Sequence, residues 1–363
     1  MNKNRYPKLV VDLKKLQHNI DRVLVNCQDQ GVEVAGVIKG CSGLPECAKL
    51  MAQEGCRFIA SSRLDQIEAV RNYGVQADFM LIRVPMLSEA ADVVRLTEIS
   101  LNSEAKVLRA LNHQAGLQDK QHKVILMVDL GDLREGFWDR EELMEAALCV
   151  ENNMHNLELA GVGTNLGCYG GIDATVEKLN ELVECAEAIE EKIGRELEFV
   201  AGGSTTSYPR VLEKNMPRRI NLLRIGEAML LARDLQDFWG CDMSDMHRDV
   251  FTLQAEVIEA REKPTYPVGK IMYDAFERKP EFEDRGIRKR ALIALGRADF
   301  AFPDMLIPRD KNIQILGASS DHTILDVQDC QREYKVGDII EFDLCYSTIV
   351  YVTNSPNVDI VYV

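Results

Sequence analysis

The strongest constraint on the fold of this chain is the alternation of short apolar runs with longer amphipathic segments over its first two thirds. The eight apolar runs are residues 34–38, 57–60, 78–82, 98–101, 124–128, 157–162, 198–201 and 220–223. The helical stretches between them include residues 44–54, 63–73, 103–112, 141–152 and 174–192. Eight strands separated by helices are the number that a (β/α)8 barrel of the TIM type requires. The pattern predicts such a barrel, and a doubly wound open sheet is the alternative that counting strands leaves open.

The pattern changes near residue 250, where apolar runs begin to follow one another closely with Gly, Pro or Asp turns between them. The runs are residues 251–258, 290–295, 313–316, 323–327, 339–344 and 349–353. They leave no room for crossover helices and predict an antiparallel β-domain after the barrel. The run 9–11 is expected to add a strand to it. We therefore expect a barrel over residues 12–235 and a β-domain over 236–363 together with 1–11.

Charge, hydropathy and cysteine usage restrict the class of protein. A formal net charge of −15 repels phosphate backbones, so nucleic acid is not expected as a partner. No apolar run approaches the length of about 18 residues that a membrane span needs. The ten cysteines are scattered without a C-x-x-C pair, which indicates reduced thiols and a cytoplasmic location.

Lys39 ends the first barrel run and is followed by a glycine-containing loop. Burial at the end of a strand lowers the pKa of a lysine and leaves a free amine that acts as nucleophile or base. In a barrel, active groups come from the carboxyl ends of the strands and the loops that follow. Polar or glycine-rich segments follow four later runs, at residues 129–136, 164–167, 202–207 and 224–227. These segments predict a site at one end of the barrel.

Two of these segments are suited to an anion. Residues 202–205 (Gly-Gly-Ser-Thr) offer backbone N–H groups and hydroxyls, and Gly226 opens the helix after the eighth strand. A phosphate bound by the loops after strands seven and eight is a recurring feature of barrels. Arg224 flanks this loop, and Arg134 follows the fifth strand. The stretch 161–167 matches a dinucleotide fingerprint too loosely to be one.

A lysine amine beside a phosphate site predicts a Schiff base to a phosphorylated cofactor, with pyridoxal 5'-phosphate foremost. An aldolase-type lysine acting on a phosphorylated sugar explains the same features.

Six stretches resemble the alanine-racemase-like, fold type III family of pyridoxal-phosphate enzymes, and in particular its ornithine racemase branch. They are residues 37–39, 127–136, 202–204, 221–227, 286–291 and 316–322. The resemblance covers nearly the whole chain. It implies a racemase that interconverts the L and D forms of an amino acid by two-base proton transfer, acting on ornithine or another basic amino acid. The alternatives are an alanine or serine racemase of the same fold and a pyridoxal-phosphate carrier protein without catalysis.

The resemblance also implies roles for residues of the barrel. Lys39 would form the Schiff base with the cofactor and serve one face of the substrate. Arg224 would face the pyridine nitrogen and keep it unprotonated, which favours racemisation over transamination. Asn165 stands where alanine racemases carry a histidine, so a polar contact would replace stacking. The cofactor phosphate would be held by Gly203, Ser204, Thr205 and Gly226.

Racemisation requires a second acid/base group on the opposite face of the α-carbon. In alanine racemases this group is a tyrosine from the second domain of the partner subunit, and the matching stretch here places Tyr273 in that role. The register also allows Asp274, and Tyr346 is a third candidate, either as base or as phosphate ligand. The expected assembly is a homodimer with the active site at the subunit interface.

The resemblance suggests substrate-binding residues as well. They are Arg134, Asp274, Ser320 and Asp321, of which Asp274 or Asp321 would pair with a distal ammonium group. The metal-assisted D-threonine aldolase and D-serine dehydratase group carries a Cys or Asp two positions after a histidine. His322 is followed by Thr and Ile, so we expect no metal.

Overall fold

The computed structural model describes residues 5–363 and divides into two compact units. One unit comprises residues 16–247, and the other comprises the residues up to Lys15 together with 248–363. The first unit therefore extends past the expected boundary at 235. Its last residues are bonded to helix α1 (Leu13–Gln28): Asn19 Nδ2 donates to His247 O at 2.8 Å, and Asn19 Oδ1 accepts from His247 N at 2.8 Å. His18 Nε2 bonds Asp245 O at 2.7 Å.

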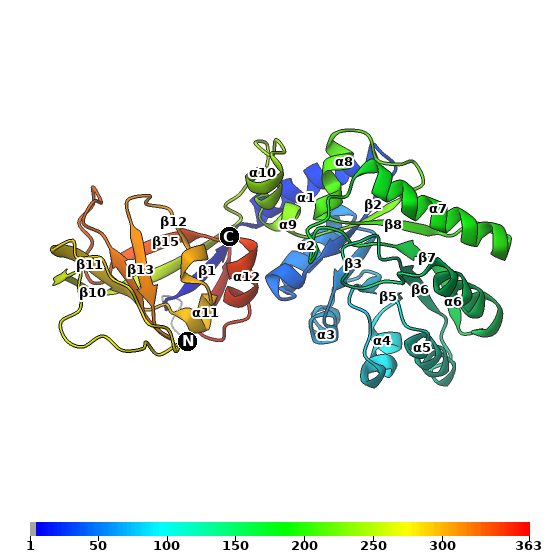
Figure 1. The fold of residues 1–363 in the computed structure, drawn as a ribbon, viewed down its shortest axis with the longest axis horizontal. Coiled ribbons are helices and arrows are strands. Elements are labelled where there is room, and N and C mark those ends of the chain that lie inside the picture. Colours follow the sequence, from blue (N-terminus) through cyan, green and yellow to red (C-terminus); the bar gives the residue numbers. More distant parts are fainter. Residues whose placement is uncertain (1–4) are drawn as a thin grey trace. The chain divides into compact units, whose positions relative to one another are not determined.

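Residues 16–247 form a closed barrel of eight parallel strands, as the apolar runs predicted (Figure 1). The strands are β2 (Glu33–Val37), β3 (Phe58–Ser61), β4 (Phe79–Leu81), β5 (Ile99–Asn102), β6 (His122–Met127), β7 (Leu157–Gly163), β8 (Phe199–Ser204) and β9 (Leu222–Ile225). Strand β2 pairs with both β3 and β9, so the sheet has no free edge. The open-sheet alternative is therefore wrong.

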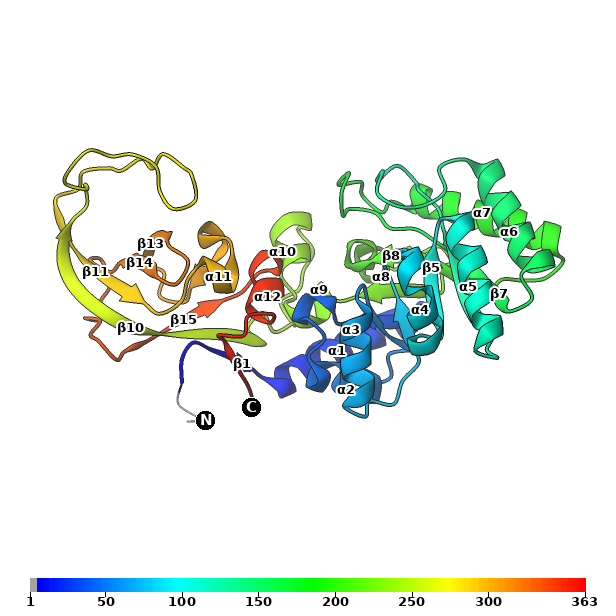
Figure 2. The same ribbon diagram turned by 90° about the horizontal axis from the view of Figure 1, so that it is seen from below.

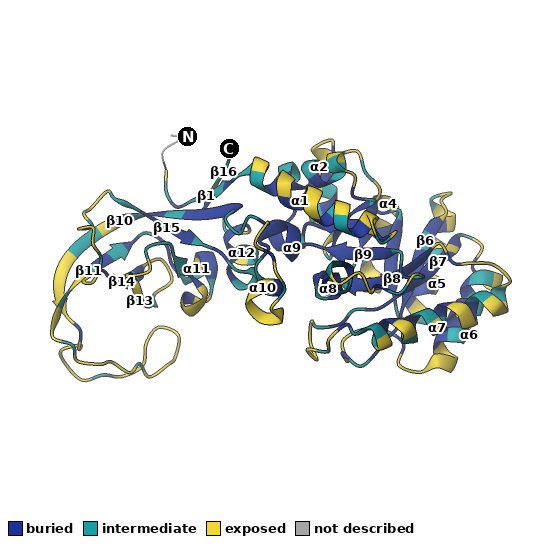
Figure 3. Ribbon diagram, turned by 90° about the horizontal axis from the view of Figure 1, so that it is seen from above, coloured by how far each residue is buried: buried dark blue, intermediate teal, exposed yellow. Residues whose placement is uncertain are grey.

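Helices surround the barrel and turn their exposed residues outward (Figures 1 and 3). They are α1, α2 (Pro45–Glu54), α3 (Leu64–Asn72), α4 (Ala90–Leu96), α5 (Ala105–Leu117), α6 (Arg140–Asn153), α7 (Val176–Ile193), α8 (Tyr208–Leu212), α9 (Glu227–Leu230) and α10 (Asp234–Trp239). Short 3₁₀ turns follow some strands: η1 (Lys39–Cys41), η2 (Leu87–Glu89) and η3 (Thr205–Ser207). Across residues 5–363, no helix is long and apolar enough to cross a membrane.

The barrel interior is filled by apolar side chains, small and large, which explains the continuous burial of its strands. The rings of Phe58 and Phe199 meet edge to face with their centroids 5.6 Å apart. A glycine permits the close approach of β7 to β8, because a Cβ on Gly161 would lie 2.1 Å from Phe199 O. Burial of apolar surface on both sides of each strand stabilises the closed sheet.

The second unit is an eight-stranded sheet built around the long, curved strand β10 (Phe251–Pro264) (Figure 2). Its other strands are β1 (Lys8–Val11), β11 (Ile287–Ile293), β12 (Ile307–Pro308), β13 (Gln314–Ala318), β14 (Thr323–Asp326), β15 (Ile339–Asp343) and β16 (Asp359–Tyr362). It also contains α11 (Arg297–Phe300), η4 (Pro303–Met305) and α12 (Tyr346–Val352). The expected strand at residues 9–11 is confirmed as β1, which pairs antiparallel with β10 and parallel with β16.

The strand expected at residues 349–353 is wrong, because this segment lies mainly in helix α12. Its β-branched residues favour a strand by propensity alone. A local cap decides otherwise: Thr348 Oγ1 accepts a hydrogen bond from Cys345 N at 3.1 Å at the first turn of the helix. Ile349 and Val352 are one turn apart and fully buried, so packing favours the helix.

We expect Asn19→Ala to lower the free energy of unfolding by about 2–3 kcal/mol, because it removes the partner of a buried carbonyl at Met229 and of two part-buried backbone groups at His247. Urea denaturation measures the change. Asn26→Ala is the matched control, since Asn26 lies on the same helix, is only half-buried and makes one bond, to Tyr208 Oη at 2.7 Å. Equal losses in the two variants would contradict this account.

Candidate functional site

Lys39 lies at the carboxyl end of the barrel in the 3₁₀ turn η1, two residues after β2 ends at Val37. The strand thus ends one residue before the end of the expected run 34–38, and Lys39 begins a turn instead of ending the strand. Lys39 is half-buried, and the desolvation that comes with this burial lowers its pKa. Negative charge at Cys168 would raise the pKa of Lys39, whereas the positive charges of Arg134 and Arg224 lower it further. Lys39 therefore exposes more neutral amine near neutral pH than an ordinary lysine does.

Arg224 lies in β9, beside Ala35 of β2, and is only 4% exposed. Its Nη2 donates to Thr164 O at 2.7 Å, whereas its Nη1 is buried and has no hydrogen-bond partner within residues 5–363. Burial lowers the pKa of Arg224 to about 10, so the guanidinium remains charged at neutral pH. A buried charged donor without a partner is costly, and an acceptor on a bound ligand would satisfy it.

Asn165 provides a second donor of this kind. It follows Thr164, whose Oγ1 donates to Val128 O at 2.8 Å. The Asn165 Nδ2 atom is buried and unpaired in the described part of the chain. Thr164, whose carbonyl accepts a hydrogen bond from Arg224, is thus followed directly by Asn165, which carries the second unpaired donor.

The glycine- and hydroxyl-rich segment formed by the end of β8 and the turn η3 lies close to these groups, since Ser204 pairs with Arg224 of β9. Gly203 has φ of 121°, and a Cβ there would lie 2.4 Å from Ser207 Oγ. Ser204 Oγ and Thr206 Oγ1 are 3.1 Å apart. Gly226 precedes α9, and a Cβ there would lie 2.9 Å from Val37 O, in the strand that leads to Lys39. This compact backbone suits an anion that bulkier residues would exclude.

Sequence reasoning missed the organisation of the loop at 129–136. Asp129 Oδ1 accepts from Gly131 N at 2.8 Å and from Leu133 N at 3.1 Å, which shapes the loop itself. Arg134 forms an ion pair with Glu135, with Nη2 and Oε1 2.6 Å apart. Glu135 in turn acts on Lys39 and Arg224, since its charge raises the pKa of both. The adjacent positions of Arg134 and Glu135 in the sequence could have predicted this ion pair.

The other expected site residues belong to the second unit. Tyr273 is 70% exposed in the segment between β10 and β11, whereas the Asp274 carboxylate accepts from Phe276 N at 2.8 Å and Arg278 N at 2.9 Å. The bond from Arg278, followed by that from Phe276, lowers the pKa of Asp274. Tyr346 is the half-buried first residue of α12. Residues 16–247 therefore contain the expected site residues of the barrel, whereas Tyr273, Asp274 and Tyr346 belong to the second unit.

Ser320 and Asp321 lie exposed in the turn between β13 and β14. Ser320 Oγ donates to Asp321 Oδ2 at 2.6 Å. The described residues contain no group of three or more His, Cys, Asp or Glu side chains placed to hold a metal ion.

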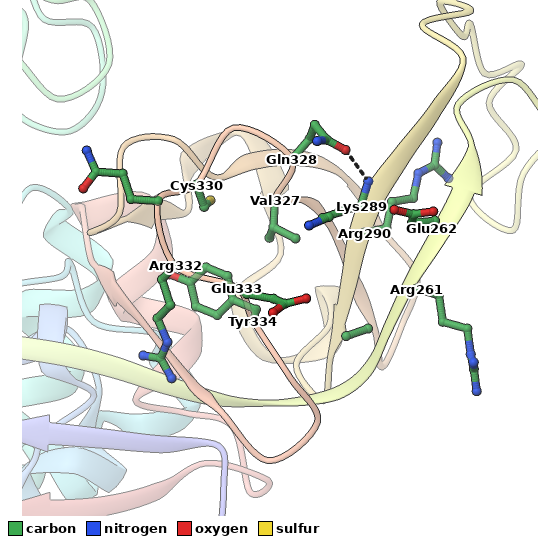
Figure 4. A pocket seen from close by; sticks show the side chains of 12 residues that line it. Arg261, Glu262, Lys289, Arg290, Val327, Gln328, Cys330, Arg332, Glu333 and Tyr334 are labelled. Atoms are coloured by element: carbon green, nitrogen blue, oxygen red, sulfur yellow. Dashed lines mark hydrogen bonds between the residues drawn. The ribbon is translucent and has the colours of Figure 1, made fainter.

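A cavity of about 350 Å³ in the second unit does not have the character of a site (Figure 4). It is lined by residues of β10, β11 and the segment after β14. The side chains of Arg261 and Arg332 extend to opposite sides of it, and Arg332 lies over the ring of Tyr334. These two arginine side chains therefore do not point toward a common position in the cavity.

These barrel residues fit pyridoxal phosphate. Lys39 offers an amine whose pKa is lowered, and the compact backbone at Gly203 and Gly226 suits a phosphate. Two buried donors, on Arg224 and Asn165, have no acceptor among the described residues. Residues 11–234 match the family described as "Alanine racemase, N-terminal domain".

Two curated relatives are similar over nearly their full lengths. An ornithine racemase of Acetoanaerobium sticklandii is 39% identical over 345 residues, covering 95% of this chain and 96% of the relative. A lysine racemase of Thermotoga maritima is 38% identical over 357 residues, covering 98% of each.

Solved structures share the fold at low identity. An alanine racemase from Streptomyces lavendulae superposes with a TM-score of 0.78 at 16% identity, covering 99% of this chain and 98% of that one. A D-threonine aldolase from Filomicrobium marinum gives 0.73 at 14%, covering 97% and 90%.

Proposed function

The chain belongs to the alanine racemase N-terminal domain family. From this premise we propose that it interconverts the L and D forms of a basic amino acid, either ornithine or lysine. We propose pyridoxal phosphate as its cofactor. The observation that carries the proposal is the Lys39 amine, whose pKa is lowered, together with the unpaired donors of Arg224 and Asn165. The names of the two full-length relatives support the racemase activity and the class of substrate.

Four groups of barrel atoms would hold the cofactor. Lys39 would bond it covalently, Arg224 Nη1 would face its ring nitrogen, and Asn165 Nδ2 would donate to a ring oxygen. The phosphate would be held by Gly203, Ser204, Thr205 and Gly226. Bound pyridoxal phosphate would supply an electron-withdrawing ring that acidifies the Cα–H bond of an amino acid.

The chain's own side chains determine how protons move. The Lys39 amine accepts and returns a proton at Cα from one face, since burial keeps a fraction of it neutral. Because the Arg224 guanidinium is buried and charged, it leaves no proton on the atom that it faces, and this limits competing transamination. We propose that Tyr273 serves the opposite face from a second copy of the chain in a homodimer. Arg134 would orient the substrate carboxylate.

Asp274 suits the base role less well, because its carboxylate is already bonded to two backbone N–H groups. For the distal ammonium of the substrate we therefore propose Asp321, with Ser320 at its side. All ten cysteines are free thiols, which supports the proposed cytoplasmic location.

The direct test is a chiral assay of the cofactor-loaded enzyme with L-ornithine, L-lysine, L-alanine and L-serine. Loss of optical rotation should be fastest with L-ornithine or L-lysine. Preference for alanine or serine would replace the substrate assignment. A protein that binds the cofactor but racemises no amino acid would be a carrier and would contradict the proposal.

A pH series tests the lowered pKa of Lys39. A lowered pKa moves the appearance of the neutral amine to lower pH, so borohydride trapping of pyridoxal phosphate on Lys39 should reach half its maximum at a lower pH than trapping on N-acetyl-lysine amide. Peptide mapping after trapping measures the yield at Lys39. Coincident profiles for the protein and the free amine would show that the environment of Lys39 does not shift its pKa.

A further inference from the structure

Asp132 connects two loops at the mouth of the barrel. It is 1% exposed, and its carboxylate accepts from Gly167 N and Tyr169 N, each at 3.0 Å. Its backbone carbonyl accepts from Gly170 N at 3.1 Å. A buried carboxylate that receives backbone N–H groups is well satisfied and holds them rigidly. Residues 166–172 are therefore fixed to the 129–136 loop, and we call them the anchored loop.

The anchored loop is also hydrogen-bonded to the turn η3 (Thr205–Ser207), which follows β8. Thr206 Oγ1 donates to Leu166 O at 2.7 Å, and a Cβ on Gly167 would lie 2.8 Å from Thr206 Cγ2. The anchored loop begins directly after Asn165, the residue with an unpaired buried donor, and Arg224 binds Thr164 one residue earlier. It thus lies between the two loops that flank the proposed cofactor site.

Cys168 and Tyr169 are the side chains that the anchored loop exposes. A thiolate at Cys168 would lie near enough to Lys39, Arg134 and Arg224 to raise the pKa of all three. Tyr169 is 75% exposed, and Asp132 holds its backbone in place. An aromatic side chain that is exposed on a rigidly held loop, next to Cys168, has no packing role in the barrel, which suggests a ligand-facing one.

The charges around Lys39 limit where a basic substrate can place its distal ammonium. Arg134 and Arg224 carry positive charges beside Lys39, and the carboxylate of Glu135 is already paired with Arg134. The distal ammonium must therefore point away from these groups. An aromatic ring face attracts a cation without adding a competing negative charge to the site.

We propose that the anchored loop forms the barrel-side wall of the substrate side-chain subsite, with Tyr169 facing the distal ammonium of ornithine or lysine and Asp132 acting as the positioning residue. This inference rests on the proposed racemase function and adds, to the Asp321 carboxylate proposed above, a barrel residue that favours a basic side chain. Cys168 lies on the same wall and reports whether it is occupied.

A pair of variants at Tyr169 tests the ring. We expect Tyr169→Leu to lower kcat/KM for L-ornithine about five- to tenfold, mainly through KM, and to lower kcat/KM for L-alanine by a smaller factor. Tyr169→Phe keeps the ring face and should retain the selectivity. Tyr73→Leu, which removes an exposed tyrosine after α3, is the control. Equal losses for ornithine and alanine in Tyr169→Leu would overturn the proposal.

The positioning role of Asp132 is tested by thiol labelling and selectivity. Cys168 is the one exposed thiol among the ten cysteines, so iodoacetamide should label it first, and L-ornithine should protect it. Asp132→Asn should weaken that protection and reduce the ornithine-to-alanine ratio, while visible absorbance shows that the cofactor is still bound. Asp139→Asn is the matched control, because that carboxylate accepts from Glu141 N and Glu142 N at α6.

The outcomes separate the two claims. Wild-type enzyme that racemises no amino acid contradicts the proposed function. Active wild-type enzyme whose Cys168 labels equally with and without L-ornithine, or whose Tyr169→Leu variant keeps full selectivity, contradicts the anchored-loop inference alone.

Discussion

Lys39→Ala is expected to lower the rate of racemisation roughly 10⁴-fold, the upper range for the loss of a positioned acid/base group. The variant removes both the amine that would bond the cofactor and the group that moves the proton on one face. The fold should survive, because Lys39 begins a short turn and is not part of the apolar core around β2. Optical rotation with L-ornithine measures the loss, and visible absorbance measures cofactor binding.

Two comparisons identify the cause of that loss. Lys123→Ala removes a lysine from strand β6 whose ammonium lies 3.6 Å from Glu158, and it should leave the rate unchanged. Added methylamine should restore part of the activity of Lys39→Ala, because a small amine can replace the missing proton acceptor. A Lys39→Ala enzyme that racemises at the wild-type rate would exclude Lys39 from the reaction.

Tyr273→Phe is expected to lower the rate about 10²- to 10⁴-fold by removing the proton donor on the opposite face. The loss should be asymmetric. Cα–H exchange in D₂O should continue from the enantiomer that Lys39 serves and stop from the other. Asp274→Asn and Tyr346→Phe are the comparators, and Asp274→Asn should have a small effect because its carboxylate is used in a backbone turn. A large asymmetric loss in either comparator would move the role there.

Mixing the two inactive variants tests the shared site. If Lys39 and Tyr273 meet across a homodimer, subunit exchange between Lys39→Ala and Tyr273→Phe creates dimers with one intact site. About one quarter of the wild-type activity should return, since half of the dimers are mixed and each has one of two sites intact. No recovery after demonstrated subunit exchange would contradict a site built from both chains.

The barrel could be predicted because its signal is local. Strands buried on both faces read as continuous apolar runs, so each of the eight could be located without knowing its neighbours. The error at residues 349–353 has the same origin. The β-branched run favours a strand locally, but the Thr348 cap and the burial of Ile349 and Val352 in one helical face determine the structure.

The sequence by itself determined that a lysine, an arginine and a glycine-rich anion loop would meet, because the carboxyl ends of barrel strands all point to one face. Only the tertiary structure decided how the loops between them are held. Asp132 bonds Gly167 and Tyr169 across separations of 35 and 37 residues, and Arg134 is paired with Glu135. The physical reason is that strand direction follows from local hydrophobic pattern, whereas a hydrogen bond between two loops depends on where distant strands place them.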